Sequence, residues 1–230
     1  MSEQLDILIF GAHADDAEIG MGASIAKHTA RGSRVGLCDL TYAEMSSNGT
    51  VETRIKEAEE AAKILGVVSR TNLGLPDRGL FVNADHIERI TQEIRKFRPR
   101  IVFAPYWQDR HPDHIACSHL IQEAVFNAKL RRYLPDSEPV NVEQLYFYFI
   151  NDVYEADVMV DVTDAYELKM AALRAYQSQF MTGAGTVATP LNQGYVERVE
   201  ARDRLMGQRR QLTYAEGFVS KLPLVIEQFD

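Results

Sequence analysis

The chain has 230 residues, of which 46% are hydrophobic and 25% are charged, and its formal net charge is −8. This composition is typical of a folded globular protein, and the length favours a single domain over residues 1–230. An acidic chain without a basic stripe argues against nucleic acid as a partner, because phosphate backbones would repel it. No apolar run approaches the ~18 residues of a membrane span, and the first residues lack the basic segment of a signal peptide.

Cysteine usage indicates the redox compartment. The sequence contains two cysteines, Cys38 and Cys117, which are too few for a disulfide framework. Two cysteines in a chain of this length favour a reducing environment. We therefore expect a cytoplasmic protein that acts on a small molecule, with neither nucleic acid nor membrane as its partner.

Short apolar runs alternate with helical patterns through the first half of the chain. In chain order we expect strand 6–10, helix 17–31, strand 34–41, helix 52–65, strand 70–73, helix 85–97, strand 100–104 and helix 113–129. Strands that alternate with helices imply right-handed crossovers and a parallel sheet covered by helices on both faces. The sequence therefore predicts an α/β fold with a mostly parallel, doubly wound sheet.

The second half of the chain is less regular. We expect strands 144–150 and 158–162, helix 166–180, loop 182–193, helix 198–210 and a last strand 222–226. The loop contains glycine, threonine and proline and is long enough to have a function. Nothing marks a linker, so we expect this half to complete the same domain.

Two segments rich in histidine and aspartate follow predicted strands. His13-Ala14-Asp15-Asp16 comes directly after strand 6–10, and His111-Pro112-Asp113-His114 lies in the loop after strand 100–104. In a doubly wound sheet, ligands bind in the crevice where the strand order reverses. If strand 100–104 lies beside strand 6–10, the two segments meet in that crevice.

The residue types in these segments indicate a metal site. Two imidazoles and one carboxylate, with one position left open for water, are a common ligand set of catalytic zinc. We assign His13, Asp16 and His114 as the ligands. Asp15 is then free to act as a base toward the attacking water.

The proline in the second segment separates the roles of its two histidines. Pro112 biases His111 to an extended conformation and itself suits the first position of a helix. His111 is therefore expected in the loop and His114 on the first helical turn. Asp113 is placed to hold the His111 ring and to favour its protonated form.

Alternatives to a zinc hydrolase site stay open for these segments. Asp15 and Asp16 could cap the helix that follows. Capping alone, however, explains poorly why two such segments occur at the equivalent ends of two strands. A non-haem Fe2+ oxygenase also uses two histidines and one carboxylate, and a non-catalytic zinc-binding or sugar-binding module is a further alternative. A dinucleotide site is disfavoured, because Gly11–Asp16 has carboxylates where glycines would admit a pyrophosphate.

Together the two segments resemble the motifs of the LmbE/PIG-L family of zinc-dependent N-acetylglucosamine deacetylases, which have a Rossmann-like fold. The family usually has proline where this chain has Ala14. This departure is similar to the branch of bacillithiol-pathway deacetylases, which act on N-acetylglucosaminyl-L-malate. The resemblance runs nearly the length of the chain, and further branch-like segments are Ser46–Thr50, Leu75–Leu80, Ser178–Phe180 and Ala215–Phe218.

The resemblance implies a role for individual residues. It implies zinc (Zn2+), with Fe2+ as the alternative ion, on His13, Asp16 and His114. It also implies that Asp15 is the general base. His111 would stabilise the oxyanion and Asp113 would orient it. Arg54 and Asp77 match substrate-binding positions, and Tyr195 matches a tyrosine that assists at the carbonyl. Related proteins of this branch imply a homo-oligomer, a trimer or a hexamer.

The implied reaction is hydrolysis of an acetamide on a glucosamine ring, which releases acetate and a free amine. Asp15 would take a proton from the attacking water, and either Asp15 or His111 would protonate the departing nitrogen. The guanidinium of Arg54 suits a substrate carboxylate, which is consistent with a malate aglycone. Another N-acetylated amino sugar, such as chitobiose, is the alternative substrate.

Overall fold

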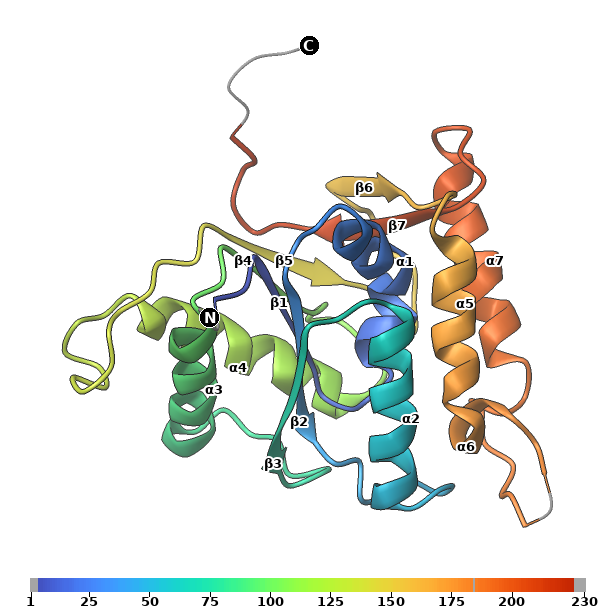
Figure 1. Ribbon diagram of the computed structural model, residues 1–230, viewed down its shortest axis with the longest axis horizontal. Coiled ribbons are helices and arrows are strands. Elements are labelled where there is room, and N and C mark those ends of the chain that lie inside the picture. The colour runs from blue at the N-terminus through green and yellow to red at the C-terminus, as the bar shows by residue number, and fades with distance from the viewer. Residues whose placement is uncertain (1–3, 184, 226–230) are drawn as a thin grey trace.

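The computed structural model describes residues 4–183 and 185–225 (Figure 1). A seven-stranded sheet of order β3-β2-β1-β4-β5-β7-β6 forms the centre of this part of the chain. The strands are β1 (Ile7–Gly11), β2 (Val35–Thr41), β3 (Ser69–Leu75), β4 (Ile101–Pro105), β5 (Gln144–Tyr148), β6 (Val158–Asp161) and β7 (Ala215–Val219). All neighbouring pairs are parallel except those of β7, which runs antiparallel to β5 and β6. The predicted α/β fold with a mostly parallel sheet is confirmed.

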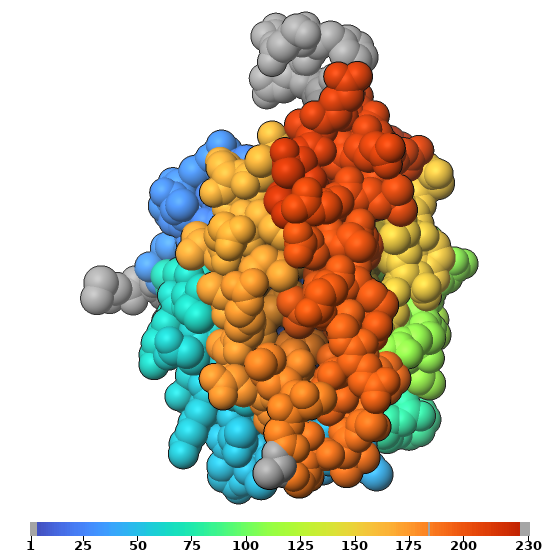
Figure 2. All heavy atoms as spheres, turned by 90° about the vertical axis from the view of Figure 1, so that its right-hand side faces the viewer, coloured from blue at the N-terminus to red at the C-terminus, as the bar shows by residue number. Residues whose placement is uncertain are grey.

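Helices cover both faces of the sheet. They are α1 (Asp16–Ala30), α2 (Val51–Ile64), α3 (Ala84–Phe97), α4 (Pro112–Ala128), α5 (Tyr166–Ala175), α6 (Gln177–Phe180) and α7 (Tyr195–Gln208). Helices α3 and α4 lie on one face, and α1, α2, α5 and α7 lie on the other (Figure 1). Figure 2 shows α5 and α7 side by side on the outside of the second layer. None of the described helices is long and apolar enough to cross a membrane.

Strand β1 lies at the middle of the sheet and is buried along its whole length. Ile7 and Ile9 pack into the core on the side of α1, α2 and α5, whereas Leu8 and Phe10 pack into the core on the side of α3 and α4. Successive side chains of a strand point to opposite faces, so a strand covered on both faces needs an apolar residue at every position. This requirement explains the continuous apolar run that the sequence shows.

The strand order reverses between β1 and β4. The chain moves outward from β1 to β2 and β3, and then returns to the other side of β1 with β4. β1 and β4 are parallel neighbours, with Ile7 opposite Ile101 and Ile9 opposite Phe103. The loops that follow these two strands therefore leave the same edge of the sheet at adjacent points.

The structure differs from the sequence prediction near the C-terminus. The prediction of a strand at 222–226 is wrong: residues 222–225 are exposed and form no strand, and residue 226 lies outside the described residues. The last strand within the described residues is β7, which contains the buried Glu216. Glu216 is accommodated by Lys169, whose Nζ lies 2.7 Å from Glu216 Oε1. Because the partner that neutralises Glu216 is distant in the sequence, the sequence pattern does not identify Glu216 as a core residue or this segment as a buried strand.

Two predicted helices are interrupted. The predicted helix 166–180 breaks at Tyr176 into α5 and α6. Helix α1 is kinked at Met21, which has φ −150° and ψ 24°. The amides of Ala23 and Ser24 after the kink donate to the Glu216 carboxylate. The buried glutamate thus stabilises the start of the second part of α1.

Candidate metal centre

The loop after β1 holds the first predicted segment in a strained conformation. Asp15 has φ 104°, in the left-handed region that non-glycine residues seldom adopt, and it precedes α1. Its side chain makes no capping hydrogen bond. The Asp16 carboxylate accepts a hydrogen bond from the backbone N–H of His13 at 3.0 Å. Helix capping therefore does not explain Asp15, and strain of this kind is typical of functional sites.

The two predicted segments meet around the carboxylate of Asp16. Asp16 Oδ1 lies 3.1 Å from His114 Nε2, and Asp16 Oδ2 lies 3.7 Å from His13 Nδ1. The ring centroids of His13 and His114 are 5.6 Å apart, and all three side chains are buried. The pairing of β1 with β4 thus brings together residues about a hundred positions apart in the sequence.

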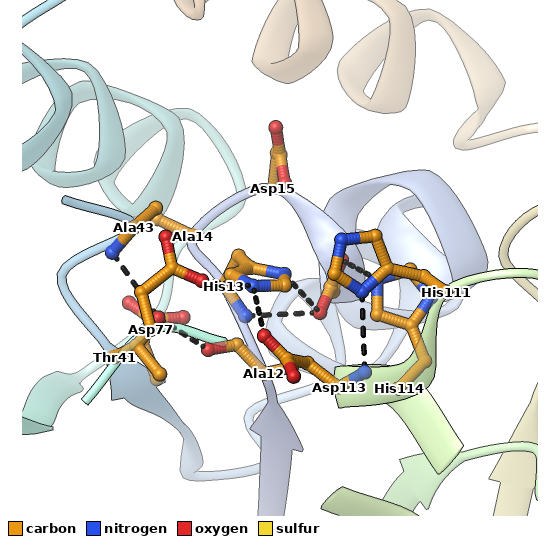
Figure 3. A network of polar contacts seen from close by, with 12 residues as sticks. Ala12, His13, Ala14, Asp15, Thr41, Ala43, Asp77, His111, Asp113 and His114 are labelled. Carbon is orange, nitrogen blue, oxygen red and sulfur yellow. Dashed lines mark hydrogen bonds and ion pairs between the residues drawn. The ribbon is translucent and has the colours of Figure 1, made fainter. Parts of the chain in front are cut away.

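Outer carboxylates contact the remaining nitrogens of both rings. His13 Nε2 is hydrogen-bonded to Asp77 Oδ1 at 3.2 Å and lies 3.4 Å from Asp113 Oδ2 (Figure 3). His114 Nδ1 lies 3.0 Å from Asp109 Oδ1. Each imidazole therefore turns one nitrogen toward Asp16 and the other toward an outer carboxylate. This is the usual arrangement of histidines that bind a metal ion.

The electrostatics of the cluster favour positive charge at its centre. Burial lowers the pKa of His13, but its contacts with Asp113 and Asp77 outweigh burial and raise the pKa to about 10. Burial is likewise outweighed at His114, where Asp16 and Asp109 raise the pKa to about 9. A divalent cation satisfies the same electrostatic demand, so these donors fit a metal ion. Among the described residues, two triads have ligand atoms that all lie within 4.8 Å of one another: His13 with His111 and His114, and His13 with Asp77 and Asp113. The predicted ligand set of His13, Asp16 and His114 is not one of these two triads.

His111 differs from the sequence prediction in its protonation. Its Nδ1 accepts the backbone N–H of Asp113 at 3.2 Å at the start of α4, so a neutral ring carries its proton on Nε2. Burial and the charges of His114 and His13 lower the pKa of His111 to about 4. The accepting Nδ1 and the lowered pKa favour a neutral His111 over the protonated ring expected from the sequence, and a neutral ring can still donate a hydrogen bond through Nε2.

The Asp113 carboxylate does not hold the His111 ring, contrary to the prediction. It contacts His13 and accepts hydrogen bonds from the Arg78 backbone N–H and from Arg78 Nη1, both at 2.9 Å. Only the backbone of Asp113 reaches His111 (Figure 3). The reason is that His111 is the N-cap residue of α4. Its imidazole accepts the backbone N–H of Asp113, which has no partner within the helix.

The Asp15 side chain points away from His13, His111 and His114 (Figure 3). It pairs with Arg54. Arg54 Nη2 lies 3.2 Å from Asp15 Oδ2 and also contacts the carbonyl of Ala14, while Nη1 donates to Ser46 Oγ at 2.9 Å. Burial raises the pKa of Asp15 to about 7, against the opposing charge of Arg54. A carboxylate with a pKa near neutrality is suited to act as a general base.

Arg54 and Asp77, both predicted to bind substrate, make extensive contacts within the protein. Arg54 is 4% exposed, and its guanidinium is engaged by Asp15 and the neighbouring loop. Asp77 accepts the backbone N–H of Met45 at 2.9 Å in addition to its contact with His13. Both residues line a cavity over the site. Within the protein, Arg54 contacts the predicted base Asp15, and Asp77 contacts the predicted ligand His13.

A cavity of about 460 Å³ opens over the cluster, and its walls include every predicted site residue except Asp113. Tyr195 reaches it from the first turn of α7, and its hydroxyl donates to Asn151 Oδ1 at 3.0 Å. The predicted functional loop contributes Thr189, Pro190 and Leu191 to the wall. The fold therefore assembles the predicted site from all parts of the chain.

Sequence reasoning missed three residues at this cavity or next to it. Asp109 contacts His114, and Asn151 links Asp109 to Tyr195. Arg110 is exposed at the rim, and no carboxylate forms an ion pair with it among the described residues. Asp109 and Arg110 directly precede His111, so the sequence shows that charged residues extend the second segment toward the N-terminus. The sequence does not show which residues they contact.

Comparisons with known proteins identify a family to which the sequence is similar. Residues 8–125 match the PIG-L family, described as GlcNAc-PI de-N-acetylase. The diacetylchitobiose deacetylase of Thermococcus kodakarensis is 31% identical over 76% of this chain and 70% of its own length. A probable N-acetyl-alpha-D-glucosaminyl L-malate deacetylase 2 of Bacillus subtilis is 27% identical over 75% of this chain and 82% of its own length.

Solved structures share the whole fold. A conserved protein of Thermus thermophilus has a TM-score of 0.90 and 40% identity, with 99% of both chains covered. The N,N′-diacetylchitobiose deacetylase of Pyrococcus horikoshii has a TM-score of 0.81 and 26% identity, with 92% of this chain and 82% of that chain covered. The chain therefore belongs to the PIG-L family of deacetylases.

Proposed function

We propose that this protein is a zinc-dependent hydrolase that removes the acetyl group from N-acetylglucosaminyl-L-malate, giving glucosaminyl-malate and acetate. The observation that carries the proposal is the Asp16 carboxylate between two imidazoles, at the floor of a cavity that also exposes Asp15. A metal site beside a spare carboxylate of near-neutral pKa is suited to hydrolysis of an amide.

His13 Nδ1, Asp16 and His114 Nε2 would hold the metal ion, and the outer carboxylates would fix the orientation of both rings. When bound, a zinc ion lowers the pKa of a water molecule and polarises the amide carbonyl. Fe2+ is a second ion that this donor set accepts.

The residues around the ion divide the proton transfers. Asp15 takes the proton of the attacking water, and its ion pair with Arg54 keeps the carboxylate in place. Neutral His111 donates its Nε2–H to the developing oxyanion. The Tyr195 hydroxyl, which donates to Asn151 Oδ1 in the structure, would add a second donor when its single proton turns from Asn151 toward the oxyanion. Because the pKa of His111 is lowered to about 4, we assign delivery of the proton to the departing nitrogen to Asp15.

The substrate assignment rests on charge at the rim of the cavity. Arg110 is exposed there without a partner carboxylate among the described residues, so it can bind an anionic aglycone such as malate. Arg54, the residue that the sequence suggested for this contact, also lines the cavity, but its guanidinium is paired with Asp15 in the structure. The similarity to the probable malate-conjugate deacetylase of Bacillus subtilis supports the same choice. Diacetylchitobiose is the second candidate, supported by the relatives from Thermococcus kodakarensis and Pyrococcus horikoshii.

Acetate release tests the proposal directly. N-acetylglucosaminyl-L-malate, diacetylchitobiose and N-acetylglucosamine would be compared with and without a chelator. We expect chelator-sensitive release that needs no oxygen, with the highest kcat/KM for the malate conjugate. A higher value for diacetylchitobiose would reject malate as the substrate, and release from none of the three would reject the hydrolase itself. Dependence on oxygen would instead indicate a non-haem oxygenase.

The cellular context also forms part of the proposal. Cys38 and Cys117 are buried and free, which fits a reducing compartment such as the cytoplasm. A homo-oligomer and the exclusion of nucleic acid and membrane as partners stay predictions from the sequence.

A further inference from the structure

Asp109 occupies a position that the proposed reaction does not yet use. It lies in the loop between β4 and α4, and its side chain is only 5% exposed. Oδ1 accepts the backbone N–H of His111 at 2.7 Å and the side-chain amide of Asn151 at 2.8 Å, and it lies 3.0 Å from His114 Nδ1. Oδ2 accepts the backbone N–H of Asn151 at 3.3 Å. One buried carboxylate therefore contacts both histidines of the second segment and Asn151 in the loop after β5.

The His114 ring lies between two carboxylates. Nε2 faces Asp16 at 3.1 Å, and Nδ1 faces Asp109 on the opposite side of the ring. Nδ1 makes no hydrogen bond of good geometry within the described residues, and Asp109 Oδ1 at 3.0 Å is the carboxylate oxygen that faces it. A proton on Nδ1 leaves the Nε2 lone pair available for a metal ion.

Hydrogen bonds through Asn151 connect the Asp109 carboxylate to Tyr195. Asn151 donates its side-chain amide to Asp109, and its Oδ1 accepts the hydroxyl of Tyr195 at 3.0 Å. Tyr195 OH also lies 3.4 Å from the carbonyl of Ile150. The amide of Asn151 can make both contacts only in one orientation, because its nitrogen donates and its oxygen accepts.

We propose that Asp109 is a positioning residue that orients His114 for metal binding and, through Asn151, sets the position of the Tyr195 hydroxyl over the cavity. This inference rests on the proposed ligand role of His114. Asp109 touches neither the reacting amide nor the metal ion, so its effect reaches the reaction by two separate routes. One route ends at the affinity for the metal, and the other ends at kcat.

Metal affinity tests the first route. Asp109→Asn retains the shape and one acceptor oxygen but removes the charge, and Asp109→Ala removes both. Zn2+ affinity would be measured by competition with a chromophoric chelator, and the absorption spectrum of the Co2+-loaded protein would report the ligand geometry. We expect Asp109→Ala to weaken zinc binding about 10- to 100-fold and to change the Co2+ spectrum, with a smaller loss for Asp109→Asn.

A matched control separates this effect from a general loss of structure. Asp157→Asn changes another loop carboxylate that accepts a backbone N–H, that of Ser220 at 2.9 Å, without a histidine nearby. This variant should bind zinc as the unmodified protein does. Unchanged zinc affinity and an unchanged Co2+ spectrum in the folded Asp109→Asn and Asp109→Ala variants would overturn the inference. If the unmodified protein itself binds no zinc, the proposed function fails instead.

Kinetics test the second route. Asn151→Ala should lower kcat about 10-fold while zinc affinity stays within about 2-fold of the unmodified protein. The substitution removes the side-chain hydrogen bonds of Asn151 to Asp109 and Tyr195 but leaves the contact between Asp109 and His114. Tyr195→Phe should lower kcat by a similar factor, and the double variant should be no slower than the slower single variant. Losses that multiply in the double variant would show that Asn151 does not act through Tyr195.

Discussion

Arg54 offers a sharp test of how the site is arranged, because its guanidinium contacts Asp15 directly. Arg54 Nη2 lies 3.2 Å from Asp15 Oδ2, and both side chains are buried. With an effective dielectric constant of about 20, the Coulomb attraction at this distance is on the order of 5 kcal/mol before the cost of desolvation. The usual net effect of an arginine beside an aspartate is to lower the carboxyl pKa by ~1–3 units.

Arg54→Met removes this charge and retains much of the side-chain volume. The pKa of Asp15 should then rise further, because burial already raises it to about 7 against the opposing charge of Arg54. A base acts only in its ionised form. The acid limb of the kcat/KM profile should therefore move to higher pH by ~1–3 units, with at least a ~10-fold loss near neutral pH and partial recovery in alkaline buffer.

The assay is acetate release across the neutral and alkaline range from N-acetylglucosaminyl-L-malate and from N-acetylglucosamine. Because Arg54 acts on Asp15, both substrates should lose activity by the same factor. Arg110→Ala is the matched control, and its loss should be confined to the malate conjugate. An acid limb that does not move in Arg54→Met, or a loss confined to the malate conjugate, would refute the reasoning.

Three further substitutions test the ligands, the base and the core. Asp15→Asn should lower kcat at least ~100-fold while zinc stays near stoichiometric by elemental analysis, and near-normal turnover would remove Asp15 from the mechanism. His13→Ala and His114→Ala should lose bound zinc, so full metal content in either variant would contradict the ligand assignment. Lys169→Met leaves the buried carboxylate of Glu216 without its cation and should lower the free energy of unfolding by ~3–5 kcal/mol in urea denaturation. A loss below ~1 kcal/mol would mean that the buried ion pair contributes little.

The sequence by itself determined most of the fold. The apolar run of β1 requires burial on both faces, and strands that alternate with helices require a parallel sheet. The segments His13–Asp16 and His111–His114 were recognisable because rare residue types occurred together after strands. These features are local, so neighbouring residues carry the information.

Only the tertiary structure decided which side chains face one another. The sequence could not establish that β4 lies beside β1, and this pairing is what joins the two segments. It placed Arg54 and Asp113 near the site but did not reveal that Arg54 pairs with Asp15, that Asp113 pairs with Arg78, or that Asp109 contacts His114. The direction of a side chain depends on backbone dihedrals and on the packing of distant elements, whereas residue spacing defines only which residues are available.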